Sequence, residues 1–481
     1  MLKLHPHLHT HSLLPDLLSF PENAPTSFSL PDLQRWFIES PPLHPALLAC
    51  VGWTALVWVL SEATGNVSQV DRLWTTIPLS YSALFTFYPY LTGMVANVRE
   101  LDPRMLLVFG LQCAWSARLT FQSARRGFLN PNSEDYRWPI VRNALNPLVF
   151  KIFNLVFIAI YQNILLLVAE LPQYLLLTHH LSSSSHVSAL ARLKPHHLKT
   201  SHVPLNAADV VLAVLFLTTL VVEMKADNQQ QRFQKLKHGA LDKQQRGAQM
   251  SIEEQKAVQR GFVAEGLWSW SRHPNFAAEQ TTWWLLYAFT VLPFLPVSQS
   301  LTSHPLSTLS TLSSLLTPLT FSTLFTHSKT SLSYLSARTP SLSETLTSLH
   351  HPLAWARVYL TNPTYALSAA LTSWPAFKLS LFRGARLAWA EAKNDEGTYW
   401  NYSILAPVFM SLLFVASTEL TERITAGKYP LYKTYKKRVA KFIPTATPLK
   451  GLWLALTGGR RGKVDRKIWG EGKGKGQFKK A

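Results

Sequence analysis

Long apolar runs recur along the chain, and they restrict its possible folds more than any other feature. The run at 75–97 holds 23 residues, enough to cross a bilayer as a tilted helix. Seven runs have the length or apolarity of a span: 46–60, 75–97, 105–121, 148–169, 207–224, 281–297 and 402–418. Two more, 366–382 and the Leu-rich part of 305–326, are ambiguous. The sequence therefore predicts an all-α, polytopic transmembrane helical bundle of about seven to nine spans.

The charge of the chain fits a membrane protein. Only 15% of its 481 residues are charged, against roughly 25% in soluble domains, although the formal net charge is +20. The basic segments 122–147 and 225–272 and the tail after 419 all fall on one side of the predicted bundle, which predicts a cytosolic face. We expect these cations to meet anionic lipids and not nucleic acid. Membrane lipids and a hydrophobic small-molecule substrate are the expected partners, and no obligate protein partner is inferred.

Composition also suggests how the chain is divided. We expect a disordered lead at 1–40, a membrane domain at 41–444 and a basic tail at 445–481. Low-complexity stretches at 171–205 and 298–347 are interpreted as loop inserts in that domain. The alternating histidines of 5–11 fit a solvated tail better than a metal site, and no cleavable signal peptide is expected. Cys50 and Cys113 lie in apolar runs, which excludes a disulfide framework or a cysteine metal site.

The densest group of polar residues near a span is the block 266–284. Pro274 suits the first position of a helix, where its missing N–H costs nothing. From that start, Arg272, Asn275, Glu279 and Trp283 recur at steps of three, four and four, so they are predicted to share one face. Polar groups at the mouth of a span are usually retained for function. The alternative is that these side chains only anchor the helix at the interface.

Further polar blocks flank the predicted spans at 71–74, 134–138, 223–235 and 429–438. Their cations, amides and carboxylates suit a ligand that carries phosphates and hydroxyls. Glu223 and Asp227 lie four residues apart, so their charges repel unless a ligand or basic partner relieves them. A surface ion-pair cluster at 134–137 and lipid-phosphate contact at 433–437 are the plainer interpretations of two other blocks. Walker, Rossmann and common hydrolase motifs are missing from the sequence.

Several of these blocks together resemble a known family. Residues 266–276 (GLWSWSRHPNF) with Glu279, the Ala226-Asp227 segment through Phe233, and 134–138 (EDYRW) are similar to the DUF1295 branch of the steroid 5-alpha-reductase-like membrane proteins. The ending from Tyr429 through 444 resembles the C-terminal signature of that family. The similarity runs from about Asp71 to Pro444, apart from the two inserts. It implies a helical bundle whose cavity opens to the cytosol and the membrane.

The resemblance also implies an activity. Relatives of this type use NADPH to reduce a carbon–carbon double bond conjugated to a carbonyl, so the expected substrate is a lipid or sterol-like enone. A proton donor must polarise that carbonyl. The positions matching the cofactor contacts of the reductases are Asp227, Asn275 and Glu279, with Arg272, Lys235 and Tyr432 as further candidates. The Asn that the reductases carry four residues before the Asp is Glu223 here.

Two residues are candidates for catalysis in this scheme. The N-terminal Gln-Glu pair of the reductases and its Tyr partner have no clear match here, and Tyr136 and Asp71 are the residues predicted to polarise the substrate carbonyl in their place. No metal is expected to take part. Residues 478–481 come close to a di-lysine retrieval signal, so we expect the endoplasmic reticulum with basic loops and C-terminus in the cytosol.

Two other functions remain open at this stage. Glu419, Glu422 and the Tyr432-x-x-Tyr435 pair loosely fit an S-adenosylmethionine-dependent membrane methyltransferase of the isoprenylcysteine type. That family has a Gly where this chain has Ala278, and it lacks the Asp227 block and the block at 134–138. The third candidate is a non-enzymatic lipid-binding membrane protein that keeps the fold. Loss of nucleotide binding would point to it.

Overall fold

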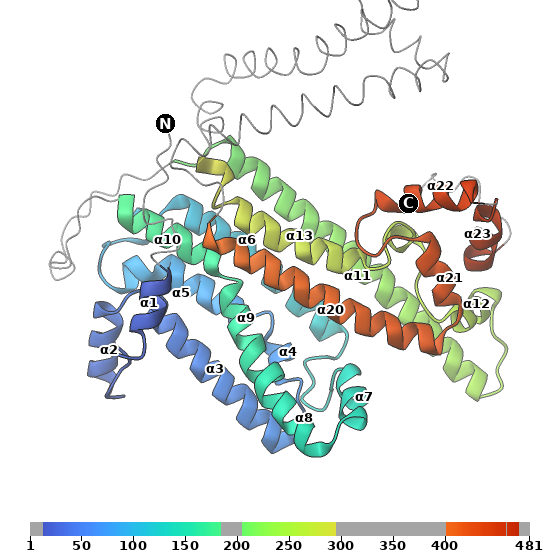
Figure 1. Ribbon diagram of the computed structural model, residues 1–481, viewed down its shortest axis with the longest axis horizontal. Helices are drawn as coiled ribbons and strands as arrows, with labels where there is room; N and C mark the ends of the chain where they lie inside the picture. Colours follow the sequence, from blue (N-terminus) through green and yellow to red (C-terminus); the bar gives the residue numbers. More distant parts are fainter. Residues whose placement is uncertain (1–12, 184–203, 295–400, 458, 471–481) are drawn as a thin grey trace, which may run out of the picture. The chain divides into compact units, whose positions relative to one another are not determined.

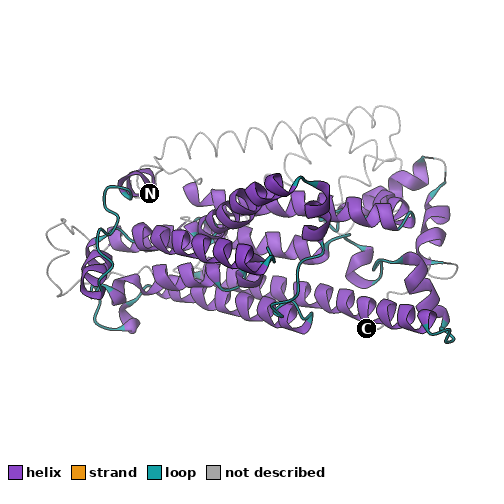
Figure 2. Ribbon diagram, turned by 90° about the horizontal axis from the view of Figure 1, so that it is seen from below, coloured by secondary structure: helices purple, strands orange, loops and turns teal. Residues whose placement is uncertain are grey.

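Helices form nearly all of the regular structure in the computed structural model, which describes residues 13–183, 204–294, 401–457 and 459–470. Within these ranges no strand forms, and a single parallel bridge joins Ser271 to Ala440 (Figure 2). The described residues, apart from Phe294, belong to one unit made of 5–293 and 400–481. The prediction of an all-α protein is confirmed.

The helices follow one another closely along the chain. Those of the first part are α1 (Leu13–Ser19), α2 (Leu30–Glu39), α3 (Leu43–Thr64), α4 (Gln69–Leu73), α5 (Ile77–Leu91), η2 (Val98–Glu100), α6 (Pro103–Arg125), α7 (Arg137–Ala144), α8 (Pro147–Phe153), η3 (Asn154–Tyr161), α9 (Gln162–Val168) and α10 (Leu171–Ser183). The remainder are α11 (Ala207–Gln245), α12 (Ile252–Arg260), η5 (Gly266–Ser269), α13 (Pro274–Ala288), η6 (Leu292–Phe294), η8 (Tyr402–Ile404), α20 (Leu405–Lys428), α21 (Leu431–Arg438), α22 (Ala446–Leu456) and α23 (Arg461–Trp469).

Each of the seven predicted spans overlaps a helix, although α13 covers only 281–288 of the run 281–297, whose last three residues lie outside the described residues. In the described residues four helical segments are long and apolar enough to cross a membrane: Leu43–Thr64, Pro147–Val168, Ala207–Gln245 and Tyr402–Lys428. Their large apolar side chains stay exposed to an extent that only lipid would cover, for example Val51 at 59% and Val210 at 61%. Helices α5 and α13 hold only 15 residues each, shorter than the predicted runs. The protein is an all-α helical membrane protein.

Three helices that are distant in sequence form the side of the bundle that carries most of the polar blocks. Helix α11 packs along α13, and α13 packs against α20 (Figure 1). The start of α11 is fixed by a capping box in which Asn206 and Asp209 satisfy each other's backbone N–H groups. Arg104 of α6 also binds Asp209 through two N–H···O bonds of 2.7 and 2.8 Å, and both side chains are buried. This ion pair fixes α6 against α11.

One span contains an unusual turn. Residues Pro147–Val168 form a continuous helical segment whose middle, η3, is a π-helix. The rings of Phe153, Phe157 and Tyr161 stack along it at centroid separations of 5.0 and 5.4 Å. π-Helical turns are frequent at functional sites, because the extra residue redirects side chains. Here Phe153 and Phe157 turn toward the cavity described below.

Two predicted segments differ from the structure. The expected disordered lead forms α1 and α2 within its described part, since the Asn23 carbonyl accepts from Trp36 and Asp16 accepts from Tyr174. The expected insert at 171–205 begins with α10, whose side chains from Leu171 to Leu177 are buried in the bundle. Its Leu-rich composition reflects core packing, not a loop. The predicted insert at 298–347, both ambiguous runs and the histidines of 5–11 lie outside the described residues.

The C-terminal helices form a small cluster next to the end of α20. Helix α21 packs on α22 and α23 (Figure 1), and Tyr432, Tyr435 and Ile468 share an apolar core with Phe262. The segment 271–273 pairs with 440–441, because the Arg272 and His273 amides donate to the carbonyls of Ala440 and Lys441. Two of the sequence blocks, 266–276 and 429–444, therefore contact each other. We call this region of contact the joint.

Candidate functional site

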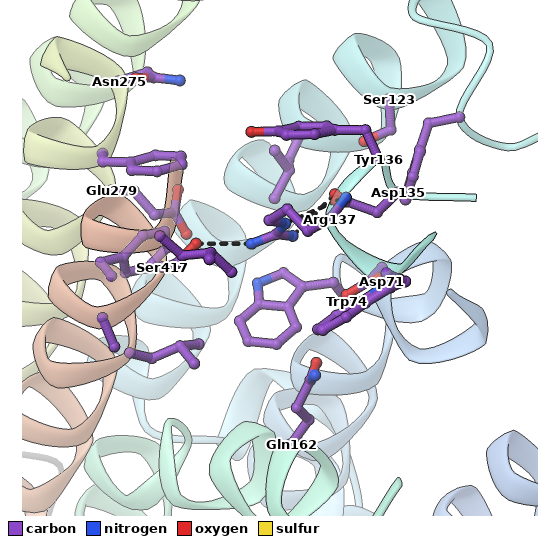
Figure 3. A pocket seen from close by; sticks show the side chains of 18 of the residues that line it. Asp71, Trp74, Ser123, Asp135, Tyr136, Arg137, Gln162, Asn275, Glu279 and Ser417 are labelled. Carbon is purple, nitrogen blue, oxygen red and sulfur yellow. Dashed lines mark hydrogen bonds and ion pairs between the residues drawn. The ribbon is translucent and has the colours of Figure 1, made fainter. Parts of the chain in front are cut away.

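A cavity of about 820 Å³ lies between the helices at the polar end of the bundle. Its walls come from the α4–α5 region, α6, the 134–138 loop, the π-helical span, α11, α13 and α20. Figure 3 shows Asn275 and Glu279 on one side and Asp71, Tyr136 and Arg137 on the other, directed toward a common space. Its size falls in the range of small-molecule sites, and its lining combines aromatic rings with a few convergent polar groups.

One arginine outside the cavity lining holds the carboxylates of the polar wall together. Arg118 of α6 contacts Glu223 at 2.6 Å, Asp227 at 3.3 Å and Glu279 at 3.3 Å, and its side chain is 7% exposed. Glu279 also accepts hydrogen bonds from the indole N–H groups of Trp115, at 3.0 Å, and Trp283, at 3.2 Å. The basic partner that the Glu223–Asp227 pair required is thus a residue of the neighbouring helix.

Asp227 and Asn275 complete this wall. Arg126 binds Asp227 at 2.7 Å, and the Asn275 side-chain amide donates to Asp227 at 3.1 Å. The Asn275 Oδ1 atom is buried and has no hydrogen-bond partner in the described structure, so it is an acceptor available to a ligand. The side chain of Arg126 is 43% exposed at the edge of the cavity. The Arg126 cation, the Asn275 Oδ1 acceptor and the Asp227 carboxylate therefore lie together at the cavity.

The opposite wall comes from the 134–138 loop. Arg137 forms a two-bond ion pair with Asp135 and donates to Ser417 Oγ of α20 at 2.7 Å (Figure 3). Glu134 pairs with Arg142 at 2.6 Å. These residues do form the ion-pair cluster that was the plainer interpretation, and Glu134, Asp135 and Arg137 also line the cavity.

The two predicted catalytic residues both face the cavity. Tyr136 is 55% exposed, and among the described residues its hydroxyl donates only a long 3.4 Å bond to Thr421. Asp71 accepts from Trp138 Nε1 at 2.8 Å. Burial raises the pKa of Asp71, while the Arg137 charge and the Trp138 N–H oppose this effect. The structure brings both side chains to one cavity, and their chemical roles stay predictions.

Arg272 does not share a face with Asn275, Glu279 and Trp283, and this part of the sequence interpretation was wrong. Helix α13 does begin at Pro274, but His273 before it has φ −139° and ψ 66°, which turns Arg272 away from the helix. Its guanidinium binds Glu422 at 2.6 Å and the Val439 carbonyl at 2.6 Å. Arg272 is 5% exposed, so it belongs to the buried joint and not to the cavity wall.

Tyr432 and Lys235 also lie away from the described cavity lining. Tyr432 is 4% exposed, and its hydroxyl donates to Glu422 at 3.3 Å within the same joint. Lys235 is exposed on α11, beyond the cavity. His273 contacts Glu422 at 3.1 Å, and burial lowers the pKa of its ring although Glu422 opposes the shift. Roles for Arg272, Tyr432 and Lys235 in cofactor binding remain predictions.

Sequence reasoning missed three residues of this site: Arg126, which lines the cavity, and Trp115 and Arg118, which contact the carboxylates of the polar wall. A signal was present, because Trp115, Arg118 and Gln122 of α6 and Arg126 at its C-cap recur at steps of three, four and four. That face lies against α11, where Gln122 donates to Asn228 at 3.2 Å.

The sequence matches the family described as "Protein of unknown function (DUF1295)" over residues 57–325, more than half of the chain. The chain belongs to the DUF1295 family. An uncharacterized protein of Schizosaccharomyces pombe is 33% identical to it over 235 residues, or 49% of this chain and 60% of that protein. The chain therefore spans less than two thirds of the length of this relative. No solved structure matches.

The DUF1295 match has a clear relation to the cavity. It includes the cavity residues Asp71, Arg126, Asp227 and Glu279, which come from four separate segments. It ends before α20, whose Ser417 completes one wall. The polar wall of this DUF1295 protein therefore lies within the matched region, while the helix that closes the cavity lies beyond it.

Proposed function

We propose that the protein is a membrane-embedded, NADPH-dependent reductase of a carbon–carbon double bond conjugated to a carbonyl in a lipid or sterol-like substrate. One observation carries this proposal: Asp227, Asn275 and Glu279, the positions expected to contact the cofactor, converge on a single cavity. The same cavity is lined by Phe153, Phe157 and other apolar residues of the lipid-exposed spans. An apolar substrate could thus lie beside a polar group of ligands.

The residues at the polar wall suit the carboxamide and hydroxyl groups of such a cofactor. The unpartnered Asn275 Oδ1 can accept from a carboxamide, and the carboxylates of Asp227 and Glu279 can accept from hydroxyls. Arg126 is the exposed cation at the edge and would hold a phosphate. When bound, NADPH supplies the hydride, and the chain supplies orientation and exclusion of water.

Tyr136 and Asp71 would act at the substrate carbonyl. The Tyr136 hydroxyl has only one long bond to give up, so it can donate to a carbonyl oxygen on which negative charge develops. The raised pKa of Asp71 lets it keep its proton to higher pH than an ordinary aspartate. Asp71 also accepts from Trp138, another residue of the cavity lining.

The proposed location follows from the distribution of charge. The basic segments 122–147, 225–272 and the tail after 419 would face the cytosol, where NADPH is available. The residues at 478–481 favour the endoplasmic reticulum as the membrane.

Binding of nucleotides to the purified full-length protein in detergent tests the proposal. We expect NADPH to bind, and Glu279→Gln to weaken it by about tenfold or more, roughly 1.4 kcal/mol. Glu253→Gln is the matched control, because Glu253 is exposed on α12 away from the cavity. A thermal melt of each variant establishes that it is folded.

The other outcomes identify the rival functions. Binding of S-adenosylmethionine in place of NADPH would replace the proposal by methyl transfer. Binding of neither nucleotide by folded protein would leave a non-enzymatic lipid-binding protein. If NADPH binds, reduction of a panel of enone lipids should follow, and Tyr136→Phe should lower kcat more than it raises KM.

A further inference from the structure

The polar wall contains more buried negative charge than its cations balance. Glu223, Asp227 and Glu279 all lie within 3.3 Å of Arg118 and are each 3% exposed as residues. The second cation, Arg126, reaches only Asp227 and is 43% exposed. Among the described residues no other cation lies within 4 Å of these carboxyl groups. Three carboxylates would thus face two guanidinium groups in a site screened from water.

Such a site favours the retention of one proton. Like charges at this separation disfavour ionisation of one member, and burial adds to the effect. One retained proton reduces the three negative charges of the carboxyl groups to two, which the positive charges of the two arginines then balance.

The hydrogen bonds around each group single out Glu223. Asp227 accepts from Arg118, Arg126 and Asn275, and Glu279 accepts from Arg118 and two indole N–H groups. Such donors stabilise an ionised carboxylate. Arg118 is the one donor in contact with Glu223 among the described residues, and this 2.6 Å contact is not aligned as a hydrogen bond. A neutral acid can still present its carbonyl oxygen to Arg118.

We propose that Glu223 is held as a neutral carboxylic acid in the cavity wall and is the proton donor of the site. Glu223 lines the cavity beside Asn275 and Glu279, so its proton can reach a bound substrate. The donor role rests on the proposed reductase function, whereas the protonation itself does not.

The reduction adds two electrons and one hydrogen to the β-carbon as hydride, with NADPH as the reductant. The Glu223 O–H bond then breaks, and its proton forms the C–H bond at the α-carbon with the electron pair of the enolate. Glu223 is left as a carboxylate and regains its proton from water at the open side of the cavity. The Tyr136 hydroxyl would hold the carbonyl oxygen throughout.

Infrared spectroscopy of the ligand-free protein in lipid nanodiscs tests the protonation. At pH 7 we expect a carbonyl stretch of a protonated carboxylic acid that disappears in Glu223→Gln. Glu170→Gln is a control for another deeply buried carboxyl group, which accepts from Gln112 at 2.8 Å. Glu223→Asp keeps a carboxyl group and should shift the band instead of removing it. This variant tests the assignment if Glu223→Gln does not fold. An unchanged spectrum in folded Glu223→Gln, or loss of the band in Glu279→Gln, would overturn the assignment.

A second measurement separates this inference from the proposed reductase function. Glu223→Gln should still bind NADPH within about threefold of wild type but lose enone reduction by at least about a hundredfold, as expected for a general acid. A wild-type band that depends on Glu223, in a protein that binds no NADPH, would leave the protonation standing and refute the reductase. NADPH binding by a protein that lacks this band would refute the protonation of Glu223 and leave the reductase proposal standing.

Discussion

Arg118 is the residue on which the polar end of the cavity depends. Its guanidinium lies among Glu223, Asp227 and Glu279, which come from two other helices, so it joins α6 to both α11 and α13. A buried cation with three acidic neighbours is stabilised only while these contacts remain. The same residue therefore serves both the stability of the bundle and the electrostatics of the site.

Replacing Arg118 should destabilise the protein strongly. We expect Arg118→Met to cost roughly 3–5 kcal/mol, because it leaves buried carboxylates without their common partner. Unfolding in detergent, followed by denaturant titration, measures this. Arg125→Met is the matched control on the same helix: Arg125 is exposed, and it donates to Gln122 and Asn228. An equal loss in both variants would contradict the central role of Arg118.

His273 should make stability depend on pH. Burial lowers the pKa of the folded ring, so below the ordinary value of about 6.5 the unfolded chain binds a proton that the folded chain does not. Stability is therefore lost as the pH falls through this range. The melting temperature of wild type should drop more between pH 7 and 5 than that of His273→Gln. His238→Gln, at an exposed position of α11, should behave as wild type; a flat wild-type profile would refute the effect.

At the residue scale, sequence reasoning found the acidic half of the site more readily than the basic half. Asp227, Asn275 and Glu279 stand in blocks that resemble a family pattern, and all three line the cavity. Arg118 lies inside an apolar run, so its partners could not be known before α6 was placed beside α11. The side-chain direction of Arg272 could not be predicted either, because it depends on the backbone turn at His273.

At the scale of elements, the apolar runs predicted where helices form but not how they end. Helix α5 stops at Leu91 after Pro89, whereas the run continues to 97. Helix α11 continues for 39 residues, far past the predicted end at 224, because its later half packs on α12 and η5. The segment α10 was mistaken for a loop insert, since Leu-rich low complexity does not distinguish a buried helix from a loop.

The contact of η5 with α11 explains why a glycine stands at the start of the block 266–276. Gly266 has φ +61°, and a Cβ there would lie 2.5 Å from the side-chain amide of Gln229. Gln229 in turn accepts from the Leu267 amide at 3.0 Å. The glycine is thus required by close approach as well as by backbone conformation.

This geometry leads to a prediction with an internal control. Gly266→Ala should cost more than Gly247→Ala, because Gly247 has a similar φ of +66° but open space around it. We expect about 1 kcal/mol for the backbone strain alone and a further loss at Gly266 from displacement of Gln229. Parallel denaturant titrations of the two variants measure the difference. Equal losses would show that the contact with Gln229 is unimportant.

At the scale of the whole molecule, contacts between distant segments decide the structure. Arg137 reaches Ser417 of α20, and Arg272 reaches Glu422, across separations of 280 and 150 residues. The sequence indicated that the blocks 266–276 and 429–444 occur together, but not that they pair through the Ser271–Ala440 bridge. Such pairings follow from tertiary packing, which no local pattern encodes.

The joint around Glu422 should hold the C-terminal helices in place. Glu422 is fully buried and contacts Arg272, His273 and Lys436. Glu422→Gln leaves a buried guanidinium without a counter-ion, so we expect a loss of roughly 3–5 kcal/mol. Limited proteolysis should then cut the chain after α20 faster than in wild type.

The matched control lies one turn away. Glu419 on the same helix is 40% exposed and pairs with Arg423 and Lys441, so Glu419→Gln should cost less than about 1 kcal/mol. If Glu422→Gln leaves both the unfolding curve and the proteolysis pattern unchanged, the joint does not stabilise this part of the protein.

The length of α11 has a consequence for the depth at which a lipid would have to react. Glu223 lies 16 residues after Ala207, which corresponds to about 24 Å along the helix axis at 1.5 Å per residue. The hydrocarbon layer is about 30 Å thick, and the closely spaced exposed apolar side chains of α11 extend to Met224, with Leu236 the one large exposed apolar residue further along the helix. The carboxyl groups thus lie close to the level of the lipid headgroups. An amphipathic molecule whose reactive bond is within a few ångströms of its polar end could reach them without leaving its leaflet, whereas a bond near the methyl end of an acyl chain could not.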